Sequence, residues 1–489
     1  MLDRLDAAVG DGLERAMVHH HMRRLRRHGR MDALAPASPG LWAATAAAPR
    51  DGNALEVLID GANALPRMAE AIGAARRHVH ICSWHLQPDF EPVRDGARRP
   101  VRELLAEAAE RVPVRVLVWA GAPVPVFKPS RASVEHAREQ LVRGTRIRCL
   151  LDARGRMMHC HHEKIVIVDD EVAFVGGIDL TALAGDRYDW SEHPLREGIG
   201  WHDASSQIRG PLVRDVAAHF ALRWEAIACR QGIPRRDGGP GAGEALELPE
   251  VPAPAGDVTA QLVRTVPERA YPALPRGEFS TLEAYMRALR SARRLIYLEN
   301  QFLWSPEVVD VLERKLREPP GDDFRLVVLL PHKANNGQDD TRGMLGRLVA
   351  ADAGAGRFLA ATIHSRTAER SGPLYVHAKI GIVDDEWLAV GSANLNEHSL
   401  FNDTEVDVVT CDPRLARDTR LRLWAEHLET APHEDPVKAI DEQWRPIASE
   451  QLERRRRGAP LTHHLVELPG VSRRSRRLLG PLDALVVDG

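Results

Sequence analysis

The chain of 489 residues lacks any long hydrophobic run. It contains no stretch of about 18 consecutive apolar residues, the length from which a membrane-spanning helix is suspected. Its first residues, Met1 to Arg4, include an acid and are not followed by the apolar segment of a secretory signal. We therefore expect neither a membrane span nor a signal peptide. With 44% hydrophobic and 28% charged residues, the composition is that of a globular protein, and the length of 489 residues predicts two domains.

Cysteine is also scarce. The five cysteines are Cys82, Cys149, Cys160, Cys229 and Cys411. Their number is odd, they are scattered, and no two stand in a CxxC spacing, so the pattern fits reduced thiols better than a disulfide framework. Reduced thiols are typical of the cytoplasm, where we expect this protein to be.

An excess of charge of one sign is missing as well. The formal net charge is -3 and the isoelectric point is about 6.8. Without a basic field over the whole molecule, any recognition of an anion must be local. This weakens the hypothesis of a nucleic-acid-binding protein but leaves it open.

Lysine is the rarest of the charged residues, because only six of the 66 basic side chains are lysines. Two of the six occur in copies of one pattern, His-x-Lys-x-x-x-x-Asp. The copies consist of His162, Lys164 and Asp169, and of His377, Lys379 and Asp384. A compact ammonium group is not interchangeable with a planar guanidinium group in a crowded phosphate site. In a chain that otherwise uses arginine, the two lysines are therefore predicted to be chemically required.

Each copy of the pattern is predicted to lie on a strand. Residues two apart on a strand project to the same side, so the His and the Lys of one copy point together, while the aliphatic run behind them anchors the strand in a core. If the two copies face each other, they place two imidazoles and two ammonium groups around one phosphate. Asp169 and Asp384 fall at the strand ends, where we expect them to hold the motif together.

Helices and strands alternate from Leu55 onward, which predicts an α/β fold with central sheets. The arrangement occurs twice. Residues 71–81 align with 288–298 at an offset of 217, and the two motif histidines are 215 apart. Two landmarks at nearly one offset indicate a duplicated domain. A pseudo-twofold arrangement of the duplicates would put both motifs at their shared interface.

The expected domains are an N-terminal arm (1–45), a first repeat (46–230), a Gly- and Pro-rich linker (231–258), a second repeat (259–430) and a C-terminal extension (431–489). Both terminal regions contain runs of arginine. These runs are Arg23 to Arg27, Arg454 to Arg457 and Arg473 to Arg477. They are interpreted as solvated faces or, alternatively, as contacts to anionic lipid headgroups.

On these motifs the chain resembles the phospholipase D superfamily, whose members carry two such patterns. After the second motif, Gly391-Ser392-Ala393-Asn394 is similar to the Gly-Ser-x-Asn of that family, whereas the first is followed by Gly176-Gly177-Ile178-Asp179. The first version resembles the eukaryotic-type enzymes. Further segments similar to that branch are Arg187-Tyr188-Asp189, Trp201-His202-Asp203, Ile296 to Phe302, and Tyr375-Val376-His377. The resemblance implies two α/β sandwich domains with mixed sheets and an active site between them.

The resemblance also implies roles for the site residues. His162 is expected to be the nucleophile and His377 the general acid and base, with Lys164 and Lys379 on the phosphate oxygens. Ser392 and Asn394 are expected to bind substrate. Glu405 and Asp189 lie 28 and 27 residues after their motif histidines, where carboxylates that orient the imidazoles are plausible.

No cofactor and no metal are expected. His159, Cys160 and His161 stand beside the first motif, but no second group of ligands has the spacing of a metal site. The chain shows no obvious C2, PX or PH domain, so the resemblance does not imply calcium dependence.

The first functional hypothesis is a phospholipase D-type enzyme that hydrolyses phospholipid headgroups to phosphatidate and an alcohol through a covalent phosphohistidine, with headgroup exchange when another alcohol intercepts that intermediate. A cardiolipin synthase-like phosphatidyltransferase, a nuclease and a non-catalytic lipid-binding protein are the alternatives. The expected partners are a phospholipid substrate and the membrane surface, with the protein acting as a monomer that contains an internal pseudo-dimer.

Overall fold

The fold was analysed in a computed structural model. It describes residues 2–93, 99–123, 129–154, 159–181, 201–230, 246–333, 338–366 and 371–468. Two of the sequence predictions, Asp189 and the arginine run 473–477, lie outside these ranges, as does most of the predicted linker.

The first half of the chain forms a mixed sheet of seven strands. Their order across the sheet is β1 (Arg50–Ile59), β8 (Ala204–Arg209), β6 (Val172–Gly176), β5 (Ile165–Val168), β2 (Val79–Ser83), β3 (Val114–Trp119) and β4 (Arg148–Asp152). The last three run parallel to one another and the other pairings are antiparallel. The aliphatic run of the first motif is β5, near the middle of this sheet.

The second half repeats the same strand order. The sequence across the sheet is β9 (Val258–Val266), β18 (Glu405–Thr410), β17 (Trp387–Gly391), β16 (Ile380–Val383), β11 (Leu295–Glu299), β12 (Arg325–Leu329) and β13 (Phe358–Arg366). The strand β16 of the second motif occupies the place that β5 has in the first sheet. The predicted α/β fold with two related mixed sheets is therefore confirmed.

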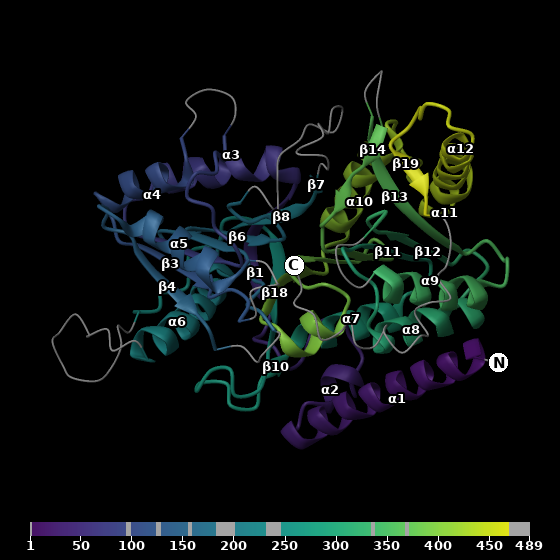
Figure 1. The fold of residues 1–489 in the computed structure, drawn as a ribbon, viewed down its shortest axis with the longest axis horizontal. Helices are drawn as coiled ribbons and strands as arrows, with labels where there is room; N and C mark the ends of the chain where they lie inside the picture. Colours follow the sequence, from purple (N-terminus) through teal and green to yellow (C-terminus); the bar gives the residue numbers. More distant parts are fainter. Residues whose placement is uncertain are drawn as a thin grey trace.

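Helices cover both faces of each sheet (Figure 1). In the first half these are α3 (Asp60–Gly73), α4 (Val101–Ala109) and α5 (Arg131–Val142) on one face and α6 (Val213–Arg230) on the other. In the second half they are α7 (Ser280–Ser291), α8 (Pro306–Arg317) and α9 (Gln338–Asp352) on one face and α10 (Pro413–Leu428) on the other. Successive side chains of β5 pack into the two opposite cores, which explains why the whole run is aliphatic.

The two halves are joined by strand pairing at two places. Strand β1 pairs with β9 in antiparallel orientation, with Arg50 opposite Ala260. The short strands β7 (Trp201–His202) and β15 (Tyr375–Val376) pair in parallel. Because β7 and β15 directly precede Asp203 and His377, this second pairing brings the beginning of one motif against the other half.

The terminal segments pack on the second half. Helices α1 (Leu2–His28) and α2 (Met31–Leu34) lie beside α7 and α8 (Figure 1), and Leu25 and Ala33 belong to the same core as these helices. After η2 (Ile440–Trp444) and α12 (Arg445–Arg456), strand β19 (Leu465–Glu467) pairs with the free edge of β13. No helix in the described ranges has both the length and the hydrophobicity of a transmembrane span.

The side chains of the two motif aspartates accept hydrogen bonds from the backbone. Asp169 accepts hydrogen bonds from the backbone N–H groups of residues 76, 77 and 78, and Asp384 accepts three from residues 293, 294 and 295 at 2.7 to 2.8 Å. Both have left-handed backbone conformations, with φ of 59° and 54°, which aspartate tolerates better than most residues. Each aspartate thus ties the strand end of the motif to the beginning of β2 or β11.

We predict that Asp384→Ala lowers the free energy of unfolding by about 2–4 kcal/mol, because three backbone N–H groups lose their acceptor. Asp384→Asn keeps one acceptor oxygen and should lose less. Denaturant unfolding measures both changes. Unchanged stability together with lost enzymatic activity would assign Asp384 a chemical role instead.

Candidate active site

The two motif histidines face each other where the halves meet. His162 precedes β5 and His377 precedes β16, and their ring centroids are 6.2 Å apart. Both side chains are buried, with 2% and 4% of their surface exposed. At this separation of centroids, both imidazoles can reach one small group bound beside them.

Each imidazole is held by a carboxylate from the other half. Nδ1 of His162 lies 3.0 Å from Oε1 of Glu405, at the beginning of β18. Nδ1 of His377 lies 2.7 Å from Oδ2 of Asp203, directly before β8. A protonated Nδ1 donates to the carboxylate in each pair, which leaves Nε2 as the nitrogen that can act on a substrate.

The backbone at the beginning of each motif is also hydrogen-bonded to the opposite half. The N–H of His162 donates to the carbonyl of Thr404 at 3.0 Å, and the N–H of His377 donates to the carbonyl of His202 at 2.8 Å. Ring and backbone of each histidine are therefore fixed by the same segment of the opposite half. The relative position of the two imidazoles depends directly on how the halves dock.

Asp203 is the carboxylate that contacts His377, and this contact was not predicted from the sequence. In the strand register, Ser205 pairs with Gly176 as Asp407 pairs with Gly391, so Asp203 and Glu405 are equivalent positions of the repeat. The chain between β6 and β8 is longer than that between β17 and β18. Counting residues from the motif histidine therefore led to Asp189, which lies outside the described residues, while the segment Trp201-His202-Asp203 contained the signal.

Both motif lysines are buried at the same place. Nζ of Lys164 donates to the carbonyl of His162 at 2.5 Å, and Nζ of Lys379 donates to the carbonyl of His377 at 2.5 Å and to Oε1 of Gln301 at 3.3 Å. These bonds fix each ammonium group beside its own histidine. The indole of Trp84, 5.6 Å from Nζ of Lys164, covers one side.

The residues after the two motifs differ because the two carboxylates differ in length. Oγ of Ser392 donates to Oε2 of Glu405 at 2.5 Å and so supports the partner of His162. At the equivalent Gly177, a Cβ atom would lie 2.1 Å from Oδ1 of Asp203. The shorter aspartate occupies the space of the missing serine side chain, which explains why glycine stands there.

Asp179 and Asn394 also differ in their contacts. Asp179 accepts hydrogen bonds from the backbone N–H groups of Trp84 and His85 at 3.0 and 2.9 Å, whereas Nδ2 of Asn394 donates to Gln301 at 3.2 Å. Gln301 in turn binds Lys379. Asn394 therefore lies beside the ammonium group of the second motif, and its contact with substrate, like that of Ser392, remains a prediction.

The site is electrostatically arranged for an anion. Burial, followed by the charges of Lys164, Lys379 and His377, lowers the pKa of His162 well below its ordinary value. Burial and the same two lysines lower the pKa of His377. Without a bound anion, His162 and His377 are therefore neutral and lie beside the ammonium groups of the two lysines. A bound phosphate would offset the lysine charges and favour protonation of one histidine.

The pKa values of the two carboxylates that contact these histidines are raised. Burial raises the pKa of Asp203 to about 6, against the attraction of Lys379, and burial raises the pKa of Glu405 well above its ordinary value. Both carboxylates therefore bind a proton more readily than a carboxylate in water does, because the buried site disfavours their charged form.

Some histidines and carboxylates near the site could offer metal ligands. The three groups are His159, His398 and Asp403; His202, Glu299 and His427; and Asp60, His202 and Glu426. In the second group, the carboxylate of Glu299 contacts both imidazoles. Its Oε2 lies 2.9 Å from Nε2 of His202, and its Oε1 lies 2.8 Å from Nε2 of His427. Although burial opposes it, the charges of Asp60 and Glu299 raise the pKa of His202 well above its ordinary value. We interpret this group as a buried ion-pair network behind Asp203, and the absence of a metal remains a prediction.

The chain was compared with known proteins. The family model described as Phospholipase D matches residues 71–200 and 355–452. Phospholipase D A of Dictyostelium discoideum is 25% identical in an alignment that covers 78% of this chain and 36% of that protein. Phospholipase D alpha 1 of Cynara cardunculus is 26% identical, with coverages of 83% and 69%. The chain thus spans about a third of the first relative and about two thirds of the second.

A solved structure is similar in fold. It is the crystal structure of phosphatidylserine synthase from Haemophilus influenzae, with a TM-score of 0.51 and 13% sequence identity. The superposition covers 76% of this chain and 84% of that chain. At this identity the likeness concerns the fold alone.

A third buried carboxylate, Asp407, lies two residues after Glu405 on β18. Its Oδ1 accepts a hydrogen bond from the N–H of Ala393 at 3.1 Å, while Oδ2 has no hydrogen-bond partner among the described residues. Burial raises the pKa of Asp407 to about 7. Ionisation of this group therefore works against folding at neutral pH.

We predict that Asp407→Asn raises the melting temperature at pH 8 by about 2–4 °C and changes it much less at pH 4. The folded pKa of about 7 exceeds the unfolded value, so the native state binds more protons and loses stability as pH rises through this range. Asparagine keeps the acceptor for Ala393 and carries no charge. Calorimetry at both pH values measures the difference, and an equal shift at both would contradict ionisation as its cause.

Proposed function

The chain belongs to the phospholipase D superfamily, and on this basis we propose that it is a phosphodiesterase that hydrolyses phospholipid headgroups to phosphatidate and an alcohol. The observation that carries the proposal is the pair of buried imidazoles 6.2 Å apart, each with a carboxylate on Nδ1 and a lysine beside it. This constellation offers one nucleophile, one acid and two cations to a single phosphodiester.

In the first step, Nε2 of the neutral His162 attacks phosphorus. The N–P bond forms as the bond to the headgroup oxygen breaks, and Nε2 of protonated His377 gives its proton to the leaving oxygen. Glu405 accepts from Nδ1 of His162, which keeps Nε2 directed at phosphorus and stabilises the positive charge that develops on the ring. The product of this step is a phosphatidylated histidine and a free alcohol.

In the second step, water attacks the phosphohistidine. His377, now neutral, takes a proton from the water, the N–P bond breaks, and phosphatidate leaves. If an alcohol occupies the place of water, the same step gives a new phospholipid. Lys164 and Lys379 are proposed to bind non-bridging oxygens throughout, where their charge counts most because the site is buried.

Because both halves of the site come from one chain, we propose that the monomer is active. Phosphatidyl transfer and nucleic-acid cleavage use the same phosphorus chemistry. The three functions are therefore distinguished by identifying the substrate and the products.

The experiment is incubation of the purified protein with vesicles of mixed phospholipids, with and without a primary alcohol, followed by mass spectrometry of the products. We expect phosphatidate without the alcohol and a phosphatidyl-alcohol with it. Formation of cardiolipin from phosphatidylglycerol would favour the transferase. Cleavage of single-stranded DNA without any lipid product would favour the nuclease.

We predict that His162→Asn and His377→Asn each lower kcat by at least about 10³-fold, because each removes a group without which the two-step reaction fails. His159→Asn is the matched control, since His159 lies beside the first motif but contacts His398 rather than either imidazole of the pair. Initial rates on phospholipid vesicles measure the effect. Near-normal turnover in either motif variant would contradict the mechanism.

Asp203→Asn should lower kcat/KM by about 10²–10⁴-fold, because the amide no longer stabilises the imidazolium form of His377 or fixes its tautomer. The alkaline limb of the pH profile should also move to lower pH, since removal of a negative charge lowers the pKa of the acid. A pH–rate profile separates this role from a structural one: a uniform loss at every pH, with the limb unmoved, would contradict it.

A further inference from the structure

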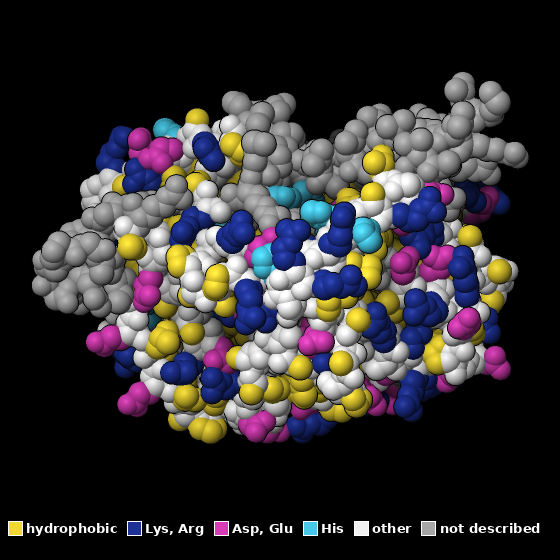
Figure 2. All heavy atoms as spheres, turned by 90° about the horizontal axis from the view of Figure 1, so that it is seen from below, with side chains coloured by type: hydrophobic (Ala, Val, Ile, Leu, Met, Phe, Trp, Pro, Cys, Tyr) yellow, Lys and Arg dark blue, Asp and Glu magenta, His cyan; other side chains and the backbone are white. Residues whose placement is uncertain are grey.

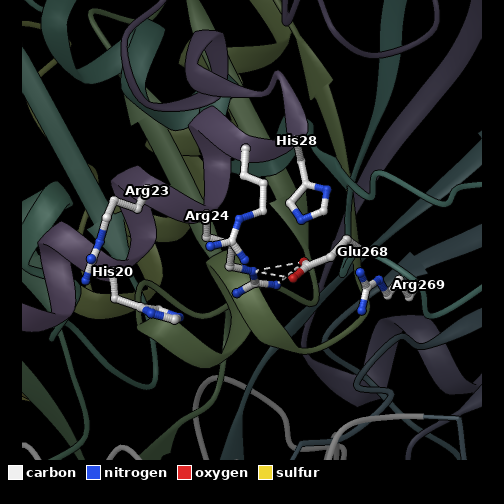
Figure 3. Close-up of a pocket in the computed structure, with 7 residues that line it drawn as sticks. His20, Arg23, Arg24, His28, Glu268 and Arg269 are labelled. Atoms are coloured by element: carbon white, nitrogen blue, oxygen red, sulfur yellow. Dashed lines mark hydrogen bonds and ion pairs between the residues drawn. The ribbon is translucent and has the colours of Figure 1, made fainter.

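Outside the catalytic site, the protein has a pocket of about 380 Å³ between helix α1 and the segment that follows β9. Its basic side chains are those of His20, Arg23, Arg27, His28 and Arg269, beside Arg24. His20, Arg23 and Arg27 are spaced by three and four residues along α1, so they share one face of the helix. The pocket thus gathers basic groups from two distant parts of the chain (Figure 3).

The floor of the pocket is a fixed ion pair. Arg24 donates to Glu268 through Nε at 2.9 Å and Nη2 at 2.5 Å, and both side chains are buried. Figure 3 shows the carboxylate of Glu268 turned toward Arg24. The one acidic side chain of the lining is therefore neutralised, and it does not offset the charges of the arginines around it.

The remaining arginines lack such partners. Within the described part of the chain, no carboxylate lies within ion-pair distance of Arg23, Arg27 or Arg269, although the molecule has many ion pairs elsewhere. Arg269 also has a left-handed backbone, with φ of 67°, a conformation that disfavours a side chain larger than glycine.

The surface around the pocket has the same character. Figure 2 shows the face of the molecule on which α1 lies, and Lys and Arg side chains gather over its middle with several histidines. This concentration contrasts with the net charge of -3 for the whole chain. The local field therefore attracts anions that the protein as a whole would not.

We propose that this pocket binds a phosphate-bearing anion of at least two negative charges, such as a phosphomonoester or a pyrophosphate. Three guanidinium groups, those of Arg23, Arg27 and Arg269, line a volume that accommodates such a group, and guanidinium matches phosphate in a bidentate manner. The anion is either soluble or the headgroup of an anionic lipid, and the two sources offer the pocket the same chemistry.

The pocket is connected to the catalytic site through its floor. Arg24 also donates to Oδ1 of Asn402 at 2.7 Å and to the carbonyl of Phe401 at 2.8 Å, both in the π-helix η1 (His398–Asn402). That helix is followed within three residues by Glu405, which holds His162. The side chain of Arg24 thus connects the pocket with the segment that leads to the proposed partner of the nucleophile.

The test compares two double variants with equal loss of charge on the same helix. Arg23→Gln/Arg27→Gln removes pocket cations, and Arg15→Gln/Arg26→Gln removes exposed arginines that do not line it. Calorimetric titration with inorganic pyrophosphate tests a soluble anion, and co-sedimentation with phosphatidylcholine vesicles, with and without phosphatidate, tests a lipid headgroup. The catalytic site is unchanged in both variants, so any anion bound there contributes equally.

We expect the pocket variant to bind one of the two probes about tenfold more weakly than wild type, and the control to stay within about twofold. A loss confined to pyrophosphate identifies a soluble ligand, and a loss of phosphatidate-dependent sedimentation identifies a lipid headgroup. Equal binding by all three proteins, or an equal loss in both variants, would overturn the proposal.

Arg269→Gly provides a second variant that does not depend on α1. Glycine suits the left-handed backbone at this position, so the fold should be retained while the cation is removed. We expect the same loss of binding with an unchanged or slightly higher melting temperature. Normal binding by Arg269→Gly would show that the helix attracts anions by itself, and the pocket would be rejected.

Discussion

The structure depends on the exchange of carboxylates between the two halves of the chain. Glu405 of the second half holds His162 of the first, and Asp203 of the first half holds His377 of the second. Each motif histidine thus pairs with a carboxylate of the opposite half rather than of its own. Docking of the halves, through the β1–β9 and β7–β15 pairings, is therefore the same event as assembly of the site. Each repeat therefore completes the site of the other.

The exchange concentrates charge in a place from which water is excluded. Two lysines and two histidines lie together, and three carboxylates nearby have their pKa values raised by burial. In the free protein the two lysine charges lie close together, and a bound anion would offset them. The hydrogen bonds of Glu405 and Asp203 hold the two imidazoles beside these charges. Active sites are the places where such strain is expected, because a group adapted to the transition state is not adapted to the empty site.

Much of this was readable in the sequence, because the signals were local. The motif spacing, the repeat offset and the aliphatic runs predicted the α/β fold and placed His162 and His377 at one interface. What could not be read was the pairing across the interface, since it depends on the length of the connection between β6 and β8. The N-terminal region illustrates the same limit. An arginine-rich helix predicts a solvated face, yet Arg24 and Leu25 are buried because other parts of the chain cover them.

In the proposed mechanism, His162 is the nucleophile and His377 is the general acid and base. Rapid quenching of the reaction on a labelled phospholipid, followed by peptide mass spectrometry under conditions that preserve phosphohistidine, tests this most directly. A phosphatidyl adduct on the peptide that contains His162, absent in His162→Asn, is the result predicted. An adduct on His377, or turnover of substrate without any adduct, would contradict the account.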